Sequence, residues 1–159
     1  MTAIQAGSYV ANKKITVVNS RSIAECMLCL PVIDFDGTLE EAFDEVNQVI
    51  NNCTKAFVYH SIKNISFGND EVRKIDFFSM TDGKRIIAIQ ETLDKVVLET
   101  VKRVLAEKSA GLITVFYGDG IASEYIDYLM EKIQSLGFDV ETTSVCTMES
   151  FYSLVLTFE

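Results

Sequence analysis

Residues 112–120 read LITVFYGDG, and this stretch decides the fold class. Its first six residues form a nearly continuous apolar run, which is typical of a strand in the middle of a sheet covered on both faces. The next three, Gly118-Asp119-Gly120, predict a tight turn. A helical pattern of apolar residues follows over residues 123–136, and Gly137 marks its end. A strand, a turn and a helix in direct succession indicate helices packed on a sheet.

The segments on either side extend this pattern. Upstream, Asp82-Gly83 stands between two runs rich in β-branched and aromatic residues, which is a strong β-hairpin signal. A long amphipathic helix follows the hairpin, with Thr92 as its expected N-cap. The predicted elements of this half are, in order, strands at 75–80 and 85–89, a helix at 93–108, a strand at 112–117, a helix at 123–136, and strands at 138–142 and 151–158.

The first 70 residues also predict helices and strands. Ser22 is expected to cap a helix that Pro31 ends, and Thr38 and Glu41 have the spacing of a capping box. A β-branched run bounded by polar residues predicts an early strand. The predicted elements are, in order, a helix at 1–11, a strand at 14–19, helices at 23–30 and 39–52, a strand at 56–60 and a loop at 62–70.

Together these elements predict an α/β fold of mixed α+β character, with a mixed sheet, helices and two lobes. The division is expected near residue 70. It gives a partial α/β lobe at 1–70 and, at 71–159, a lobe made of a β-hairpin followed by α-β-α-β-β. A chain of 159 residues is normally one domain, or one domain of two lobes.

The charge balance restricts the function. Lys and Arg number 14 and Asp and Glu 23, which gives a formal net charge of −9. Nucleic-acid binding needs clustered basic side chains and is not expected, and an anionic membrane surface would repel the chain. The most apolar run, residues 26–33, is far shorter than the roughly 20 residues that cross a bilayer. We expect a soluble, cytoplasmic protein without membrane insertion.

Cys26 and Cys29 have the spacing of a redox or metal-binding pair. Both fall inside an apolar helix, however, and Cys53, Cys146 and His60 have no partner at ligand spacing, so packing in the core is the favoured interpretation. In a cytoplasmic chain all four thiols are expected to be free. Catalysis by His60 would need a neighbouring nucleophile and an orienting carboxylate, and the sequence places neither beside it. No metal site and no catalytic residue is therefore predicted.

Ser20, Arg21 and Ser22 form the first candidate binding site, because they follow a predicted strand and begin a helix. Two hydroxyls, one guanidinium and a helix N-terminus could together hold a carboxylate or a phosphate. The alternative is that Ser22 only caps the helix and Arg21 is solvated.

Tyr117, Gly118, Asp119 and Gly120 form the second candidate site. A junction of this kind can point backbone amides at an anion. The dinucleotide-binding fingerprint is only partly met, since Ser123 stands at its third glycine position, and no P-loop sequence follows. The alternatives are a tight turn before a helix and a loop that contacts a partner.

Residues 84–158 resemble the C-terminal module of fatty acid kinase, a dihydroxyacetone-kinase-like protein of Gram-positive bacteria. The features that carry the resemblance are the hairpin around Asp82-Gly83-Lys84, the long helix, Val115-Phe-Tyr-Gly-Asp119 and the closing strand. Residues 15–23 resemble both this module and the related DegV fatty-acid-binding family. The resemblance covers almost the whole chain.

The resemblance implies a DegV-like fold whose first lobe is truncated at its N-terminus. In the family, an N-terminal domain binds ATP and Mg²⁺ and phosphorylates a fatty acid that a separate DegV-like protein carries. The kinase domain is expected to be absent from this chain, which would then be a fragment of a longer protein with no cofactor of its own. The implied function is a non-catalytic module that docks the acyl-carrying protein through residues 20–22 and 117–120. The expected partners are this carrier, the kinase domain and, in a homodimer, a second copy.

Two other functions stay open. A DegV-type lipid-binding protein would hold the acyl chain in an apolar cavity, with Ser20 or Arg21 at its carboxylate. An independent enzyme would use Cys26 and Cys29. The sequence departs from the family in two loops: residues 60–62 replace an Arg-Asp-Thr-like turn, and residues 147–150 replace a Gly-Gly-Gln-Pro sequence.

Overall fold

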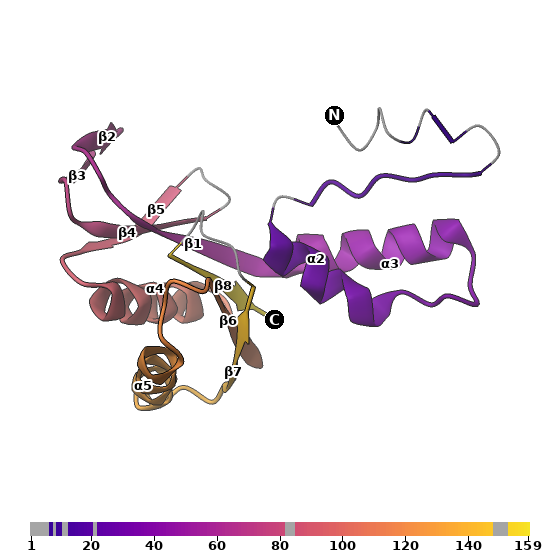
Figure 1. Cartoon of the computed structure of the whole chain (residues 1–159). Helices are drawn as coiled ribbons and strands as arrows, with labels where there is room; N and C mark the ends of the chain where they lie inside the picture. The colour runs from indigo at the N-terminus through magenta and orange to yellow at the C-terminus, as the bar shows by residue number, and fades with distance from the viewer. Residues whose placement is uncertain (1–6, 8, 11–12, 21, 82–84, 148–152) are drawn as a thin grey trace. The chain divides into compact units, whose positions relative to one another are not determined.

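The structure is a computed structural model that describes residues 7, 9–10, 13–20, 22–81, 85–147 and 153–159 (Figure 1). The chain divides into two compact units, Met1–Asn52 and Cys53–Glu159. The boundary therefore lies after Asn52 and not near residue 70, where the sequence analysis placed it. The physical reason is that β1 (Thr54–His60) pairs on both sides with strands of the C-terminal half, β4 and β8.

Two of the helices predicted in the first unit, at residues 23–30 and 39–52, are confirmed. They correspond to α2 (Ile23–Cys29), which a short 3₁₀ helix η1 (Leu30–Val32) follows, and to α3 (Leu39–Asn52). The hydroxyl of Ser22 accepts a hydrogen bond from Glu25 N at 3.2 Å, so Ser22 is the N-cap of α2. Pro31 lies in η1, directly after α2, as expected of a residue that cannot continue an α-helix.

The capping box before α3 forms as predicted. Thr38 Oγ1 accepts from Glu41 N at 3.2 Å, and Glu41 Oε2 accepts from Thr38 N at 3.0 Å. Upstream, Asp36 N donates to Asp34 Oδ1 at 2.9 Å, which stabilises a turn at residues 34–37. The start of α3 therefore follows from the local sequence alone.

The strand predicted at residues 14–19 is wrong. Residues 13–20 have no regular secondary structure and are mostly exposed. A β-branched run forms a strand only where a neighbouring strand exchanges backbone hydrogen bonds with it. The described residues of the first unit contain no strand that could do so. The helix predicted at residues 1–11 lies almost entirely outside the described residues.

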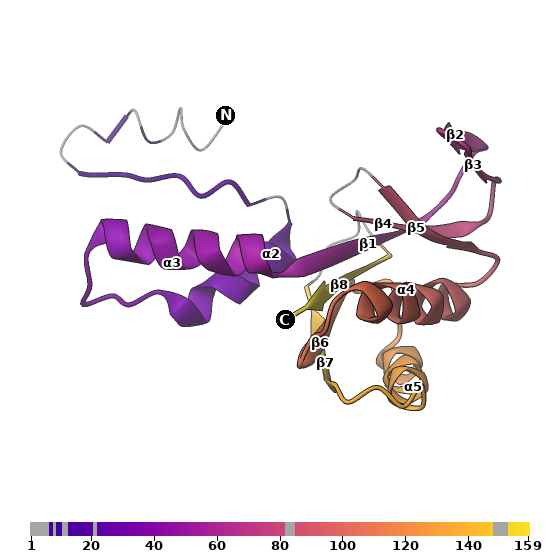
Figure 2. The same ribbon diagram turned by 180° about the vertical axis from the view of Figure 1, so that it is seen from behind.

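The second unit is built on a six-stranded sheet with the order β5-β4-β1-β8-β6-β7 (Figures 1 and 2). Its neighbouring strands run antiparallel except for β6 and β7, which run parallel. The predicted α/β fold with a mixed sheet is therefore confirmed. Besides β1, the strands are β4 (Phe77–Thr81), β5 (Arg85–Gln90), β6 (Leu112–Tyr117), β7 (Glu141–Cys146) and β8 (Leu154–Phe158).

The helices α4 (Leu93–Glu107) and α5 (Ser123–Gln134) pack on one face of this sheet (Figure 1). Alternate residues of β6 and β8 point toward them, because successive side chains of a strand face opposite sides. Each fully buried Leu, Ile or Val side chain in this layer contributes about 1.5–3 kcal/mol. The fully buried members of this core include Val97 and Val101 of α4, Ile126 and Leu129 of α5, Ile113 and Val115 of β6, and Leu156 of β8.

A buried pair of hydroxyls joins the sheet to α4. Thr100 Oγ1 donates to Val96 O at 2.6 Å, so its single proton is engaged there. Ser79 Oγ lies 2.6 Å from Thr100 Oγ1 and must therefore be the donor of that contact. Both residues are completely buried, which makes the pair a specific polar link inside an apolar layer.

Thr92 is the N-cap of α4, as predicted, but its hydroxyl does not bond to a helix amide. Its side chain instead forms a hydrogen bond with Asp94, which holds the pKa of Asp94 below its usual value. On the outer side of the helix, Arg103 Nε donates to Glu99 Oε1 at 2.6 Å, an ion pair between residues four apart.

Two elements of the second unit differ from their predictions. The loop predicted at residues 62–70 contains a hairpin of β2 (Ile65–Phe67) and β3 (Asp70–Val72), and Gly68 in its turn has φ +61°. The strand predicted at residues 138–142 is β7, which starts at Glu141 and runs to Cys146. The hairpin of β4 and β5 is confirmed, although residues 82–84 of its turn lie outside the described residues.

Within the described part of the chain, no helix combines the length and the apolar character that a membrane span requires.

Candidate functional site

The first predicted site lies in the first unit. The Ser22 hydroxyl is engaged at the start of α2, and Ser22 is buried. Ser20 Oγ lies 3.1 Å from the sulfur of Cys26, and Arg21 lies outside the described residues. The Ser22 hydroxyl accepts a hydrogen bond from a backbone amide of α2, so its local role is to cap this helix. Binding of an anion by this segment stays a prediction.

The second predicted site lies in the second unit, at the end of β6. Tyr117 O accepts from Thr147 N at 2.8 Å and from its hydroxyl at 3.3 Å, and Gly118 O accepts from Ile121 N at 3.2 Å. Asp119 and Gly120 are exposed. A Cβ at Gly120 would meet open space, so no close approach of atoms requires glycine there. A contact role for this loop stays a prediction.

The cysteines and His60 show no catalytic arrangement. Cys29 is buried, as expected, but Cys26 is exposed, which corrects the prediction that both pack in the core; neither sulfur forms a disulfide. The exposed His60 ring lies against Phe77, with 4.7 Å between ring centroids. Over the described ranges, no three His, Cys, Asp or Glu side chains are placed to hold a metal ion.

A site that the sequence analysis did not predict lies between the hairpin β2–β3 and the main sheet. The paired residues of β1 and β4 end at His60 and Phe77. Beyond this pair, a single residue, Ser61, lies opposite two residues, Ile75 and Asp76. Ile75 N donates to Ser61 O at 2.8 Å, and Ser61 N donates to Asp76 O at 2.8 Å. This arrangement is a β-bulge, and Ile75 has φ +79°, the left-handed position that such a bulge normally gives to glycine. Ile75 is the one non-glycine residue with positive φ among those described.

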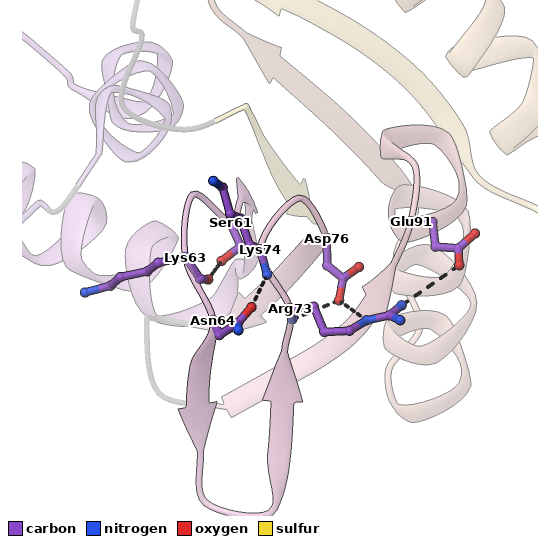
Figure 3. Close-up of polar contacts among 7 residues, drawn as sticks. All are labelled: Ser61, Lys63, Asn64, Arg73, Lys74, Asp76 and Glu91. Atoms are coloured by element: carbon purple, nitrogen blue, oxygen red, sulfur yellow. Dashed lines mark hydrogen bonds and ion pairs between the residues drawn. The ribbon is translucent and has the colours of Figure 1, made fainter.

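Residues 73–76, which we call the Ile75 turn, are held by several bonds (Figure 3). Asp76 N donates to Arg73 O at 3.1 Å, and the positive φ at the third position is that of a type II turn. The buried carboxylate of Asp76 accepts from Arg73 N at 2.9 Å and from Arg73 Nε at 3.3 Å. Arg73 Nη2 also lies 3.9 Å from Glu91 Oε1. The turn is thus fixed by its own carboxylate.

The facing segment, residues 61–64, is fixed as well. The buried Ser61 donates its hydroxyl proton to Lys63 O at 2.6 Å, and Asn64 Oδ1 accepts from Lys74 N at 2.7 Å. Figure 3 shows the side chains of Lys63 and Lys74 extending away from the Asp76 carboxylate. Residues 61–64 and 73–76 are therefore joined to each other by hydrogen bonds to their backbone.

These two segments present apolar and basic side chains to solvent. The side chains of Ile75 and Ile62 are 68% and 78% exposed. A shallow pocket of about 360 Å³ is lined by Arg73, Lys74, Ile75, Asp76 and Glu91. We call Ile62, Lys63, Arg73, Lys74 and Ile75 together the Ile75 surface. It has the composition of a contact surface, with apolar side chains inside a charged rim, and it holds no nucleophile placed beside a base.

The family of FakA-like C-terminal regions of fatty acid kinase matches residues 1–159. Relatives from several strains of Staphylococcus aureus, USA300 and N315 among them, are described as uncharacterized proteins. Each is 26% identical over 141 residues, which cover 89% of this chain and 25% of the relative. The chain thus spans about a quarter of the length of the curated relatives it matches.

Two solved structures of DegV family proteins share the fold. One, from Ruminococcus gnavus, is 16% identical with a TM-score of 0.64, and the match covers 97% of this chain and 63% of the other; its description names vaccenic acid. The second, from Corynebacterium glutamicum, is 17% identical with a TM-score of 0.63, covering 98% and 66%. At these identities the likeness establishes the fold, and it confirms the predicted DegV-like architecture.

Proposed function

The chain belongs to the family of FakA-like C-terminal regions of fatty acid kinase, and from that premise we propose that it is a non-catalytic module that docks an acyl-carrying, DegV-like protein. The fatty acid on the docked carrier would be phosphorylated by a separate kinase domain. The observation that carries the proposal is the family match over residues 1–159, because the matched region is not the kinase catalytic domain.

We propose a docking role for this chain and not a catalytic one. ATP-dependent phosphorylation takes place on Mg²⁺–ATP, which a protein holds through one or two carboxylates and the phosphates themselves. Among the described residues, no three His, Cys, Asp or Glu side chains are placed to hold a metal ion. The proposal assigns ATP and Mg²⁺ to the kinase domain and no cofactor to this chain.

Docking alone can contribute strongly to the reaction. Holding a carrier in a fixed orientation turns the meeting of fatty acid carboxylate and kinase domain into an effectively intramolecular event. Fixed placement of reacting groups can supply about 7–11 kcal/mol of a barrier in the best cases. A module with an exposed contact surface can make this contribution without chemistry of its own.

The alternative function, in which the chain holds the acyl chain itself, has less support. A DegV family protein of the same fold is described together with vaccenic acid. In this chain, however, the pocket beside Ile75 is open to solvent and is edged by charged side chains. Sites for small molecules bury most of the ligand's surface.

The test is a titration of this chain with the DegV-like carrier of the same organism, loaded with fatty acid. We expect a complex of fixed stoichiometry by calorimetry and by co-elution, with the fatty acid remaining on the carrier. If no complex forms at concentrations up to about 100 μM, the docking function is wrong. Native mass spectrometry of the chain purified alone covers the alternative, since a co-purified fatty acid would favour lipid binding.

A further inference from the structure

We propose that the Ile75 surface is the part of this chain that contacts the carrier, and that the carrier offers it an apolar hollow edged by carboxylates. This inference rests on the proposed docking function and adds to it the contact residues and the chemistry of the partner. Neither segment predicted from the sequence, residues 20–22 or 117–120, contributes to the Ile75 surface.

The backbone at Ile75 is the first argument. A β-branched residue at φ +79° is strained, and glycine would adopt the same conformation freely. The isoleucine side chain does not compensate by packing in the core, because most of it is exposed. Strain of this kind persists at binding sites, where the surrounding structure enforces it. The Ile75 side chain thus has no internal packing role that accounts for its presence.

The rigidity of the turn is the second argument. Asp76 fixes Arg73, and Ser61 fixes both Ile75 and Asp76, through bonds of 2.8 to 3.3 Å. A side chain displayed from a fixed backbone loses little conformational freedom when a partner covers it. Ile75 and Ile62 are therefore suited to act as anchors that enter a pocket of the partner.

Charge identifies the chemistry of the partner. The chain carries a net charge of −9, yet the Ile75 surface brings three cations together. Arg73 faces Asp76 and Glu91, whereas Lys63 and Lys74 form no ion pair with any carboxylate among the described residues. Unpaired cations around an apolar centre match a surface with the opposite charge, and they speed the approach of such a partner. The acidic residues of the β2–β3 hairpin, Asp70 and Glu71, lie in β3 and are not part of the Ile75 turn.

The decisive variant is Ile75→Gly, measured in the carrier titration described above. Glycine suits the backbone at this position, so the fold should be retained while the anchor side chain is lost. We expect the dissociation constant to rise about tenfold, the effect of losing a typical anchor residue. The matched control is Phe35→Ala, because Phe35 is 88% exposed in a turn of the first unit and is flanked by acidic residues. It should leave the affinity within about twofold.

The charge argument has its own pair of variants. Lys74→Glu and Lys102→Glu change the net charge equally, but Lys102 lies exposed on α4. We expect Lys74→Glu to slow association about tenfold at low salt, with a smaller effect at high salt, and Lys102→Glu to change it little. Equal effects of the two variants would overturn the role of the basic rim.

The outcomes separate this inference from the function it rests on. If the native chain binds the carrier and Ile75→Gly binds equally well, the Ile75 surface is not the contact although docking stands. If the native chain does not bind, the proposed function itself fails. If the native chain instead associates with itself and Ile75→Gly abolishes this, the surface is an interface between copies and the assignment to the carrier is overturned.

Discussion

Replacing Ile75 by glycine should stabilise the chain relative to replacing it by alanine. The left-handed region costs an ordinary L-residue roughly 1–2 kcal/mol, and glycine enters it freely. Glycine in turn loses about 0.5–1 kcal/mol more backbone entropy on folding than alanine. The mostly exposed side chain is removed in both variants, so its burial nearly cancels. The cost of the left-handed backbone less the extra entropy loss of glycine leaves about 0.5–1 kcal/mol. The free energy of unfolding of Ile75→Gly should exceed that of Ile75→Ala by this amount.

The matched position is Ile62, which is also exposed but lacks a positive φ. There alanine should be more stable than glycine, by about 0.5–1 kcal/mol, because only the entropy difference acts. The order of the two substitutions should therefore reverse between Ile75 and Ile62. The gap between the two positions, roughly 1–2 kcal/mol, measures the strain at Ile75.

Urea denaturation of the four variants measures these differences. With a slope of about 1–3 kcal/mol/M, a change of 1 kcal/mol shifts the midpoint by roughly 0.3–1 M, which is readily resolved. The slope itself should not change, since the substitutions are exposed and leave the buried area nearly constant. A glycine variant less stable than the alanine variant at both positions would refute the strain at Ile75.

Two further predictions concern the second unit. Thr100→Val should destabilise the chain by about 1–3 kcal/mol, because it leaves the buried Ser79 hydroxyl without its acceptor, whereas adding Ser79→Ala should recover most of the loss. Denaturation of all four proteins of this double-mutant cycle tests it, and purely additive losses would contradict it. Thr92→Val should lower stability at neutral pH and have little effect at about pH 2. The hydrogen bond from Thr92 lowers the pKa of Asp94, so it stabilises the folded chain at a pH above the pKa of Asp94 in the unfolded chain. This stabilisation is lost as the pH falls through the lower pKa of the folded chain. An equal loss of stability at both pH values would argue against the contact.

The elements with local causes could be predicted from the sequence. The capping box of Thr38 and Glu41 needs only residues three apart, and it starts α3 where expected. The apolar run at residues 112–117 forms an inner strand because it suits a sheet covered on both faces. The hairpin of β4 and β5 follows in the same way from its turn sequence.

The elements with tertiary causes could not be predicted. Residues 14–19 have strand propensity but no partner strand within the described part of their unit. The edge strand β7 is polar and largely exposed, so it lacks the apolar signal of an inner parallel strand. At residues 73–76 there is no glycine or asparagine to indicate a type II turn, and the pattern predicts a strand that starts at Ile75. The left-handed backbone of Ile75 depends on Ser61, a residue that sequence patterns do not connect to it.

The same substitution, Ile75→Gly, separates a structural role from a binding role because the two predict different signs. If the isoleucine served the fold, its removal would lower both the stability and any affinity that depends on the fold. If it serves as an anchor on a strained turn, Ile75→Gly leaves the stability at or above that of the native chain while the affinity falls. A site that is displayed at the expense of local strain is thus recognised by opposite changes in two independent measurements on one variant. Loss of affinity together with loss of stability relative to the native chain would place Ile75 among the structural residues.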